Sequence, residues 1–95
     1  MLIQKPVTTG EIVSIKLISG EEIIGRLDED TTDFVKLDRP KSVTITKDGL
    51  GMMPFMFLSG SDTFTIKHSH VIVMVPAEKS AADQYLQGTT GIALS

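Results

Sequence analysis

The apolar residues of this chain recur with a period of two, rather than with the period of an amphipathic helix. From Val13 to Leu17 every second residue is aliphatic, and short runs rich in valine, isoleucine, threonine and phenylalanine continue until Pro76. Glycine, aspartate and proline separate these runs. Such alternation is typical of strands with one buried face, and short strands with local connections are typical of small barrels. The pattern predicts an all-β fold, a small and strongly bent five-stranded antiparallel barrel.

The predicted strands occupy residues 12–17, 21–27, 34–37 continuing across 43–46, 52–58 with 63–67 as one strand broken at 59–62, and 71–75. Gly25 lies inside the second strand, where a glycine usually marks a bend or a close backbone approach. Pro40 kinks the third strand or places it at an edge. We expect an N-terminal arm (1–11) that is irregular or at most one turn of helix, the barrel (12–76), a short C-terminal helix (77–88) that stops at Gly88, and a flexible tail (89–95).

Composition narrows the possible functions. A domain of 95 residues buries a modest core, to which a second subunit could add. The absence of cysteine excludes a disulfide framework and a thiol nucleophile, and favours an intracellular setting. A formal charge of -3 argues against coating nucleic acid through bulk positive charge, so any such contact must be local. No apolar run approaches the ~20 residues of a membrane helix, so we expect no membrane partner and a cytoplasmic location, the host cytoplasm if the protein is viral.

Two segments carry the motifs of a known family. The first has the spacing Val13, Ile15, Leu17, Gly20, Gly25 and Leu27. In the second, residues 66–76, a strand ends at Lys67-His68, turns tightly and restarts as an apolar strand closed by Pro76. Together they resemble the Sm and Sm-like (LSm) RNA-binding proteins, and the Lys-His pair is similar to that of bacterial Hfq. The size, charge and missing cysteine also resemble Sm-like proteins from phage and marine microbes.

The resemblance implies a homo-oligomeric ring of about five to seven subunits that binds single-stranded RNA without cutting it, with DNA as a further candidate. It places Lys67 and His68 at the pore and offers the Phe34 ring for base stacking. Lys36 takes the position of the family's loop asparagine. Because that asparagine is missing, the family's strict uridine selectivity is not expected here.

The resemblance also implies how the ring would close. In the Sm family the fourth strand pairs with the fifth strand of the neighbouring copy. Phe55 and Phe57 would then meet Val71, Val73 and Val75 of the next subunit. The fifth strand is apolar at every position, which is typical of a strand covered on both faces.

Each candidate also has an ordinary structural interpretation. Phe34 could be a core residue, Lys36 a surface lysine, and Lys67 with His68 a solvated turn. His68 and His70 are two possible metal ligands, but the sequence places no third, and acidic residues 28–30 lack the pattern of a calcium loop and predict a solvated loop.

No motif of an enzyme is evident, since the chain has no phosphate-binding glycine loop, nucleophile elbow or paired catalytic carboxylate. We therefore expect neither catalysis nor a cofactor. The main alternative to RNA binding is a structural or protein-interaction module of phage origin that uses the same barrel for assembly. The charge of -3 and the missing loop asparagine favour that alternative.

Overall fold

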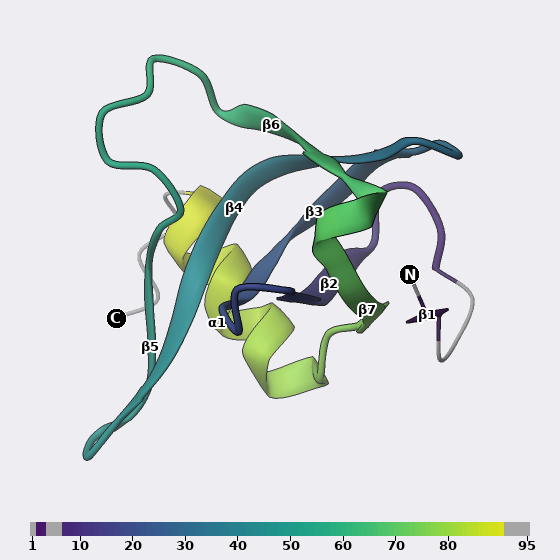
Figure 1. Cartoon of the computed structure of the whole chain (residues 1–95). Helices are drawn as coiled ribbons and strands as arrows, with labels where there is room; N and C mark the ends of the chain where they lie inside the picture. Colours follow the sequence, from purple (N-terminus) through teal and green to yellow (C-terminus); the bar gives the residue numbers. More distant parts are fainter. Residues whose placement is uncertain (1, 4–6, 91–95) are drawn as a thin grey trace.

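The computed structural model describes residues 2–3 and 7–90, which are mostly β-strand with one C-terminal helix (Figure 1). The strands are β1 (Leu2–Ile3), β2 (Ile12–Leu17), β3 (Glu22–Asp30), β4 (Phe34–Thr46), β5 (Gly49–Pro54), β6 (Thr63–Lys67) and β7 (Val71–Pro76). A 3-10 turn, η1 (His68–His70), joins β6 to β7, and α1 (Lys79–Thr90) follows. The predicted β-rich chain with a short C-terminal helix is confirmed.

The strands form one sheet in the order β1-β7-β2-β3-β4-β5, and β6 pairs with β4 beside that path. β1 joins β7 in parallel, whereas the other pairings are antiparallel. Among the described strands no pairing links β5 or β6 to β7, so the sheet is not closed and the predicted five-stranded barrel is not confirmed. The fourth strand, predicted with a break at 59–62, is two separate strands, because all of residues 55–62 leave the sheet between β5 and β6.

β4 changes its partner halfway along. Its first half, residues 34–38, pairs with β6, and its second half, residues 41–46, pairs with β5. Between the halves Arg39 has a φ of 48°, a conformation that is uncommon for a residue with a side chain, and Pro40 follows it. The predicted kink at Pro40 is therefore present, and it is the point where the strand passes from one partner to the other.

Gly25 on β3 faces this kink. The register between β3 and β4 shifts between Ile24 and Arg26, which is the signature of a bulge. A Cβ added at Gly25 would lie 3.2 Å from the Cα of Pro40, closer than a side chain normally comes to backbone. The prediction that Gly25 marks a close backbone approach is confirmed.

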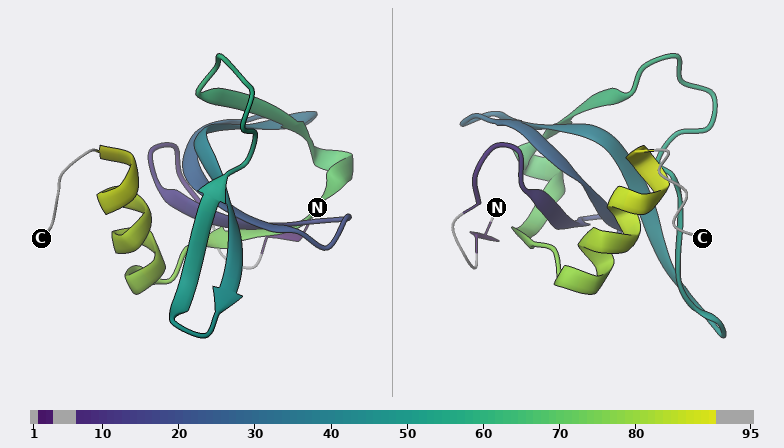
Figure 2. Two further views of the ribbon diagram at one scale, coloured as in Figure 1. Left: turned by 90° about the vertical axis from the view of Figure 1, so that its left-hand side faces the viewer. Right: turned by 180° about the vertical axis from the view of Figure 1, so that it is seen from behind.

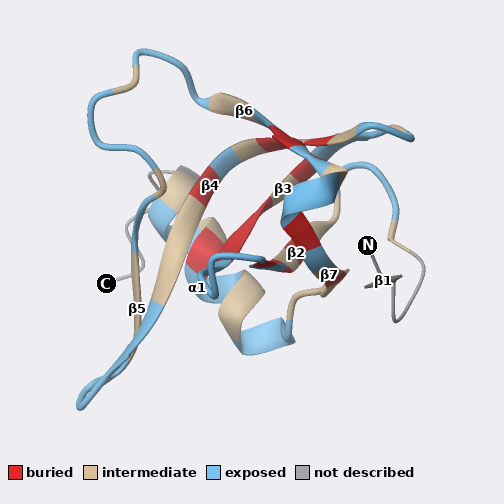
Figure 3. Ribbon diagram, viewed as in Figure 1, coloured by how far each residue is buried: buried red, intermediate tan, exposed pale blue. Residues whose placement is uncertain are grey.

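The core lies where the alternating residues of the strands meet (Figure 3). Burying one such side chain stabilises the fold by roughly 1.5–3 kcal/mol. The buried cluster consists of Val13, Ile15, Leu17, Ile23, Leu27, Val35, Leu37, Ile66, Val71 and Met74.

Helix α1 crosses the opposite side of the sheet from η1, as the view from behind shows (Figure 2). Tyr85 holds the helix against β4. Its side chain is 1% exposed, and its hydroxyl donates to the carbonyl oxygens of Asp38 and Arg39, at 2.8 and 3.0 Å. The helix is thus anchored to the kink of β4. No helix among residues 2–3 and 7–90 has the length and apolar character to cross a bilayer.

The ends of the chain differ from expectation. Helix α1 runs to Thr90 instead of stopping at Gly88, because the Arg39 guanidinium donates to the Thr89 carbonyl over 2.8 Å and stabilises the last turn. Of the expected tail, residues 91–95 lie outside the described part. The arm is not wholly irregular, since Leu2 and Ile3 pair with Val73 and Met74, while residues 1 and 4–6 lie outside the described part.

Candidate nucleic-acid interface

β4 and β6 place two of the predicted RNA-binding residues opposite each other. In their register Phe34 faces Lys67, and the next pair is Val35 with Ile66. Val35 and Ile66 point into the core, 0% and 9% exposed. Because successive residues of a strand point to opposite faces, Phe34 and Lys67 share the face that turns away from the core.

Local hydrogen bonds tie the turn before β4 to η1. The His68 N–H donates to the Asp33 carbonyl oxygen over 3.0 Å, and His68 Nε2 lies 2.8 Å from Asp30 Oδ1. The hydroxyl oxygen of Thr31 accepts from the N–H groups of Asp33 and Phe34, at 3.2 and 3.1 Å. These bonds fix the start of β4 against η1, so the positions of Phe34 and His68 are coupled.

A hollow of about 550 Å³ opens where these elements meet, and we call it the β4–β6 hollow. It contains three of the four predicted RNA-binding residues, which come from two strands and a turn. Its lining consists of Thr32, Asp33, Phe34, Thr65, Lys67, His68 and Ser69.

Lys36, the fourth predicted residue, lies outside the hollow. It stands two residues after Phe34 on the same face of β4, opposite Thr65 of β6. Its Nζ lies 3.7 Å from Asp28 Oδ2, and both side chains are substantially exposed. Such a pair contributes about 0–1 kcal/mol to stability, but it lowers the positive charge that Lys36 could offer to a phosphate.

The acidic residues at the end of β3 set the charge of this region. They are predicted as a solvated loop, but β3 continues through Asp30. Asp28 and Asp30 are two residues apart in that strand and pair with Lys36 and His68. The two-residue spacing of the aspartates could have predicted that they share one face of a strand. Their partners could not be predicted, because they depend on how β3 lies against β4 and η1.

Lys67 is differently placed. Across residues 2–3 and 7–90, no carboxylate lies within ion-pairing distance of its amine. It can therefore meet a phosphate or a base edge, while the half-buried ring of Phe34 offers a stacking face beside it. The nearby Asp33 disfavours a second phosphate, so the hollow suits a base with one phosphate contact.

The predicted interface residues fall in different environments. Phe55 packs against the core and meets Phe64 edge to face, with ring centroids 6.1 Å apart. Phe57 is 71% exposed, whereas Val71 is a core residue at 4%. The remaining two, Val73 and Val75, are half-buried on β7.

Within the described residues, no group of three or more histidine, cysteine, aspartate or glutamate side chains could hold a metal ion. Comparison with protein-family models finds no match for this chain, and comparison with curated proteins finds none either. The likeness to Sm proteins therefore rests on the two motifs, and the function follows as a proposal from the geometry.

Proposed function

We propose that the chain is an Sm-like protein that binds single-stranded RNA in the β4–β6 hollow and holds it without cleaving it. The observation that carries the proposal is the meeting of Phe34, Lys67 and His68 in one hollow. A stacking ring beside a lysine that has no ion-pair partner among the described residues is the minimal site for a nucleotide of a single strand. The carboxylates around the site limit the phosphate contacts, so stacking supplies most of the affinity.

We infer further that the bent sheet is a barrel completed between copies in a homo-oligomeric ring. In the described chain β6 pairs on one side only, with β4, so its second edge is free for a neighbouring strand. Free edges favour strand addition. The outer edge of β7 carries β1 at Val73 and Met74, so pairing of β6 with β7 of the next copy must displace β1 or extend past it.

Two substitutions test RNA binding, because each should lower the affinity with a different effect on its salt dependence. Lys67→Ala removes a charge, so the affinity for oligouridine or oligoadenine should fall and the salt dependence should become shallower by about one phosphate. Phe34→Ala removes a stacking face and should cost about 1–3 kcal/mol of binding free energy per stacked base, with the salt slope unchanged. Binding is measured by fluorescence anisotropy at several salt concentrations.

Lys47→Ala is the matched control, because Lys47 is an exposed lysine in the turn between β4 and β5, away from the hollow. Circular dichroism must show that all variants remain folded, since Phe34 is half-buried. Wild-type protein that binds no single strand at low salt would refute RNA binding. A monomer by light scattering at micromolar concentration would refute the ring.

A second function is favoured by an exposed apolar stretch that begins in β5 and continues after it. Its members are Met53, Met56, Phe57 and Leu58, which are 50%, 52%, 71% and 98% exposed. Clustered apolar side chains on a surface usually mark a protein contact. If RNA binding fails while the stretch is protected from hydrogen exchange in the assembled protein, an assembly module of phage origin becomes the better proposal.

A further inference from the structure

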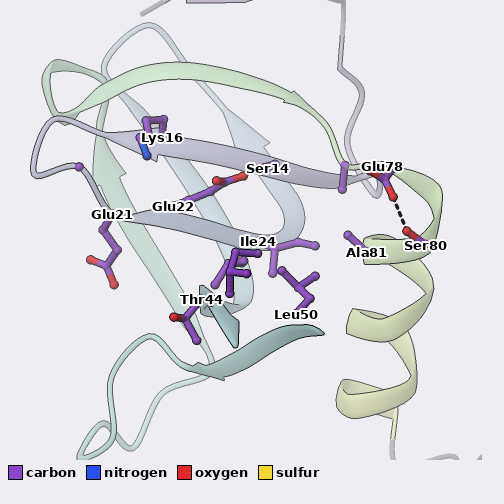
Figure 4. A pocket seen from close by; sticks show the side chains of 14 residues that line it. Ser14, Lys16, Glu21, Glu22, Ile24, Thr44, Leu50, Glu78, Ser80 and Ala81 are labelled. Atoms are coloured by element: carbon purple, nitrogen blue, oxygen red, sulfur yellow. Dashed lines mark hydrogen bonds between the residues drawn. The ribbon is translucent and has the colours of Figure 1, made fainter. Parts of the chain in front are cut away.

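A second concave surface lies between the sheet and α1, and we call it the helix-side groove (Figure 4). It has a volume of about 620 Å³, within the range of protein binding sites. β2 and β3 form one side, the β4–β5 hairpin another, and the start of α1 the third. It shares no lining residue with the β4–β6 hollow, so a ligand could occupy it independently.

The inner lining of the groove is apolar. Ile24, 2% exposed, lies at its base, and Val43 and Leu50 line it from the hairpin. On the helix side it is lined by Ala77 and Ala81, whose small side chains leave room. Such a lining suits an aliphatic side chain, which gains affinity by leaving water.

Three glutamates line the groove, and none of them belongs to an ion pair within the described chain. Each accepts a hydrogen bond from a serine hydroxyl instead. The pairs are Ser42 with Glu21, Ser14 with Glu22 and Ser80 with Glu78. One lysine, Lys16, also lines the groove, so carboxylates outnumber cations there.

We propose that the helix-side groove binds a peptide segment of a partner protein, with an aliphatic side chain flanked by lysine or arginine. The acidic lining repels nucleic acid and complements cationic side chains. Figure 4 places Glu22 on the sheet side and Glu78 at the start of α1, so cations on both sides of one aliphatic residue meet a carboxylate each. This binding is separate from the RNA site and goes beyond the proposed function.

The test titrates the full chain with three capped pentapeptides, Lys-Leu-Lys-Leu-Lys, Glu-Leu-Glu-Leu-Glu and Lys-Ser-Lys-Ser-Lys. Amide shifts in nuclear magnetic resonance locate the site and give the affinity. The basic apolar peptide should bind about tenfold more tightly than either comparator and shift the amides that line the groove. Equal binding of the acidic peptide, or shifts confined to other residues, would overturn the proposal.

Two pairs of substitutions distinguish the effect of carboxylates in the groove from the effect of the protein's net charge. The double substitution E22Q/E78Q keeps oxygens that can accept hydrogen bonds from Ser14 and Ser80. It should lower the affinity for the basic apolar peptide about fivefold. Glu29→Gln with Asp62→Asn makes the same change in charge at exposed residues outside the groove and should leave affinity unchanged.

Ala81→Lys supplies an independent check, because it adds a cation to the groove without removing a hydrogen bond. It should lower the affinity for the basic apolar peptide at least as much as E22Q/E78Q does. Lys67→Ala, in the other site, should leave the peptide affinity unchanged even if RNA binding is lost. Wild-type affinity in both E22Q/E78Q and Ala81→Lys would refute a peptide site here.

Discussion

The two halves of β4 are built for different surroundings. In the first half Leu37 is fully buried in the core, whereas Ile45 in the second half is 79% exposed. The second half is held instead by β5, whose Leu50 carbonyl accepts a hydrogen bond from Gln84 of α1 over 2.8 Å. The β4–β6 hollow therefore stands on a core strand, while the helix-side groove is walled by a hairpin that buries little. The hairpin projects from the body of the sheet (Figure 2).

The charged side chains around the β4–β6 hollow and those around the helix-side groove have different partners. Beside the hollow, Asp28 pairs with Lys36 and Asp30 contacts His68, whereas no carboxylate among the described residues lies within ion-pairing distance of Lys67. Around the groove the glutamates have only hydroxyl partners in the described chain. A net charge of -3 therefore says little about either site, because local pairing decides which sign a ligand meets.

The largest expected difference between the halves is in stability. Leu37→Ala leaves a cavity in the core and should lower the free energy of unfolding by about 2–5 kcal/mol. Ile45→Ala, on the exposed half, should change it by less than about 0.5 kcal/mol. Urea unfolding followed by circular dichroism measures both, and similar losses would contradict the distinction between a buried and an exposed half.

The kink that separates the halves should be almost as sensitive. Gly25→Ala places a Cβ 3.2 Å from the Pro40 Cα, and backbone on both sides cannot move aside easily. We expect a loss of about 1–3 kcal/mol in the free energy of unfolding. Gly60→Ala is the control, since its Cβ would meet nothing within 4 Å. A neutral Gly25→Ala would show that the close approach is adjustable.

The kink illustrates what sequence could predict. A glycine inside an alternating strand and a proline inside the next are local signals, and both had their expected effect at Gly25 and Pro40. The break at residues 59–62 also had a local signal, a run of serine, glycine and aspartate, but its extent did not: β5 already ends at Pro54, while residues 55–58 are apolar and were predicted as strand. The end of α1 depends on Arg39, fifty residues before Thr89, and such a contact leaves no trace in local composition.

The candidate site likewise has features that the sequence predicted and features that it did not. Phe34, Lys67 and His68 were predicted from motif resemblance, and β4, β6 and η1 bring them together. The pairing of Asp30 with His68 was missed, because it depends on how η1 lies against the end of β3. The helix-side groove was missed entirely, since its walls come from strands and a helix far apart in the chain.

A smaller effect should follow from the anchor of the helix. Tyr85→Phe removes the hydroxyl that reaches the kink and should cost about 1 kcal/mol of stability at neutral pH. Burial raises the pKa of the Tyr85 hydroxyl above its ordinary value of about 10. The native state therefore favours the protonated form, and this contribution is present below pH 10 and is lost as pH rises through the native pKa.

Tyr85 is the only tyrosine in the chain, so absorbance of the tyrosinate follows its ionisation directly. Unfolding midpoints in urea should fall above pH 10 in the wild type and less steeply in Tyr85→Phe. Identical alkaline slopes in both proteins would show that other groups control that transition. The groove should loosen in Tyr85→Phe while the hollow does not, which hydrogen exchange of the two regions can compare.

The smallest expected effect concerns the charge contrast itself. Asp30→Asn removes a carboxylate beside His68 and should raise the affinity of the β4–β6 hollow for oligouridine by about two- to threefold, because phosphates meet less repulsion. The gain should shrink as salt is added, since the interaction is screened within about 10 Å at 0.1 M. Glu22→Gln, which removes a carboxylate at the groove instead, is the matched control and should leave RNA affinity unchanged. If both substitutions raise RNA affinity equally, net charge rather than local pairing governs binding, and the distinction between the two sites fails.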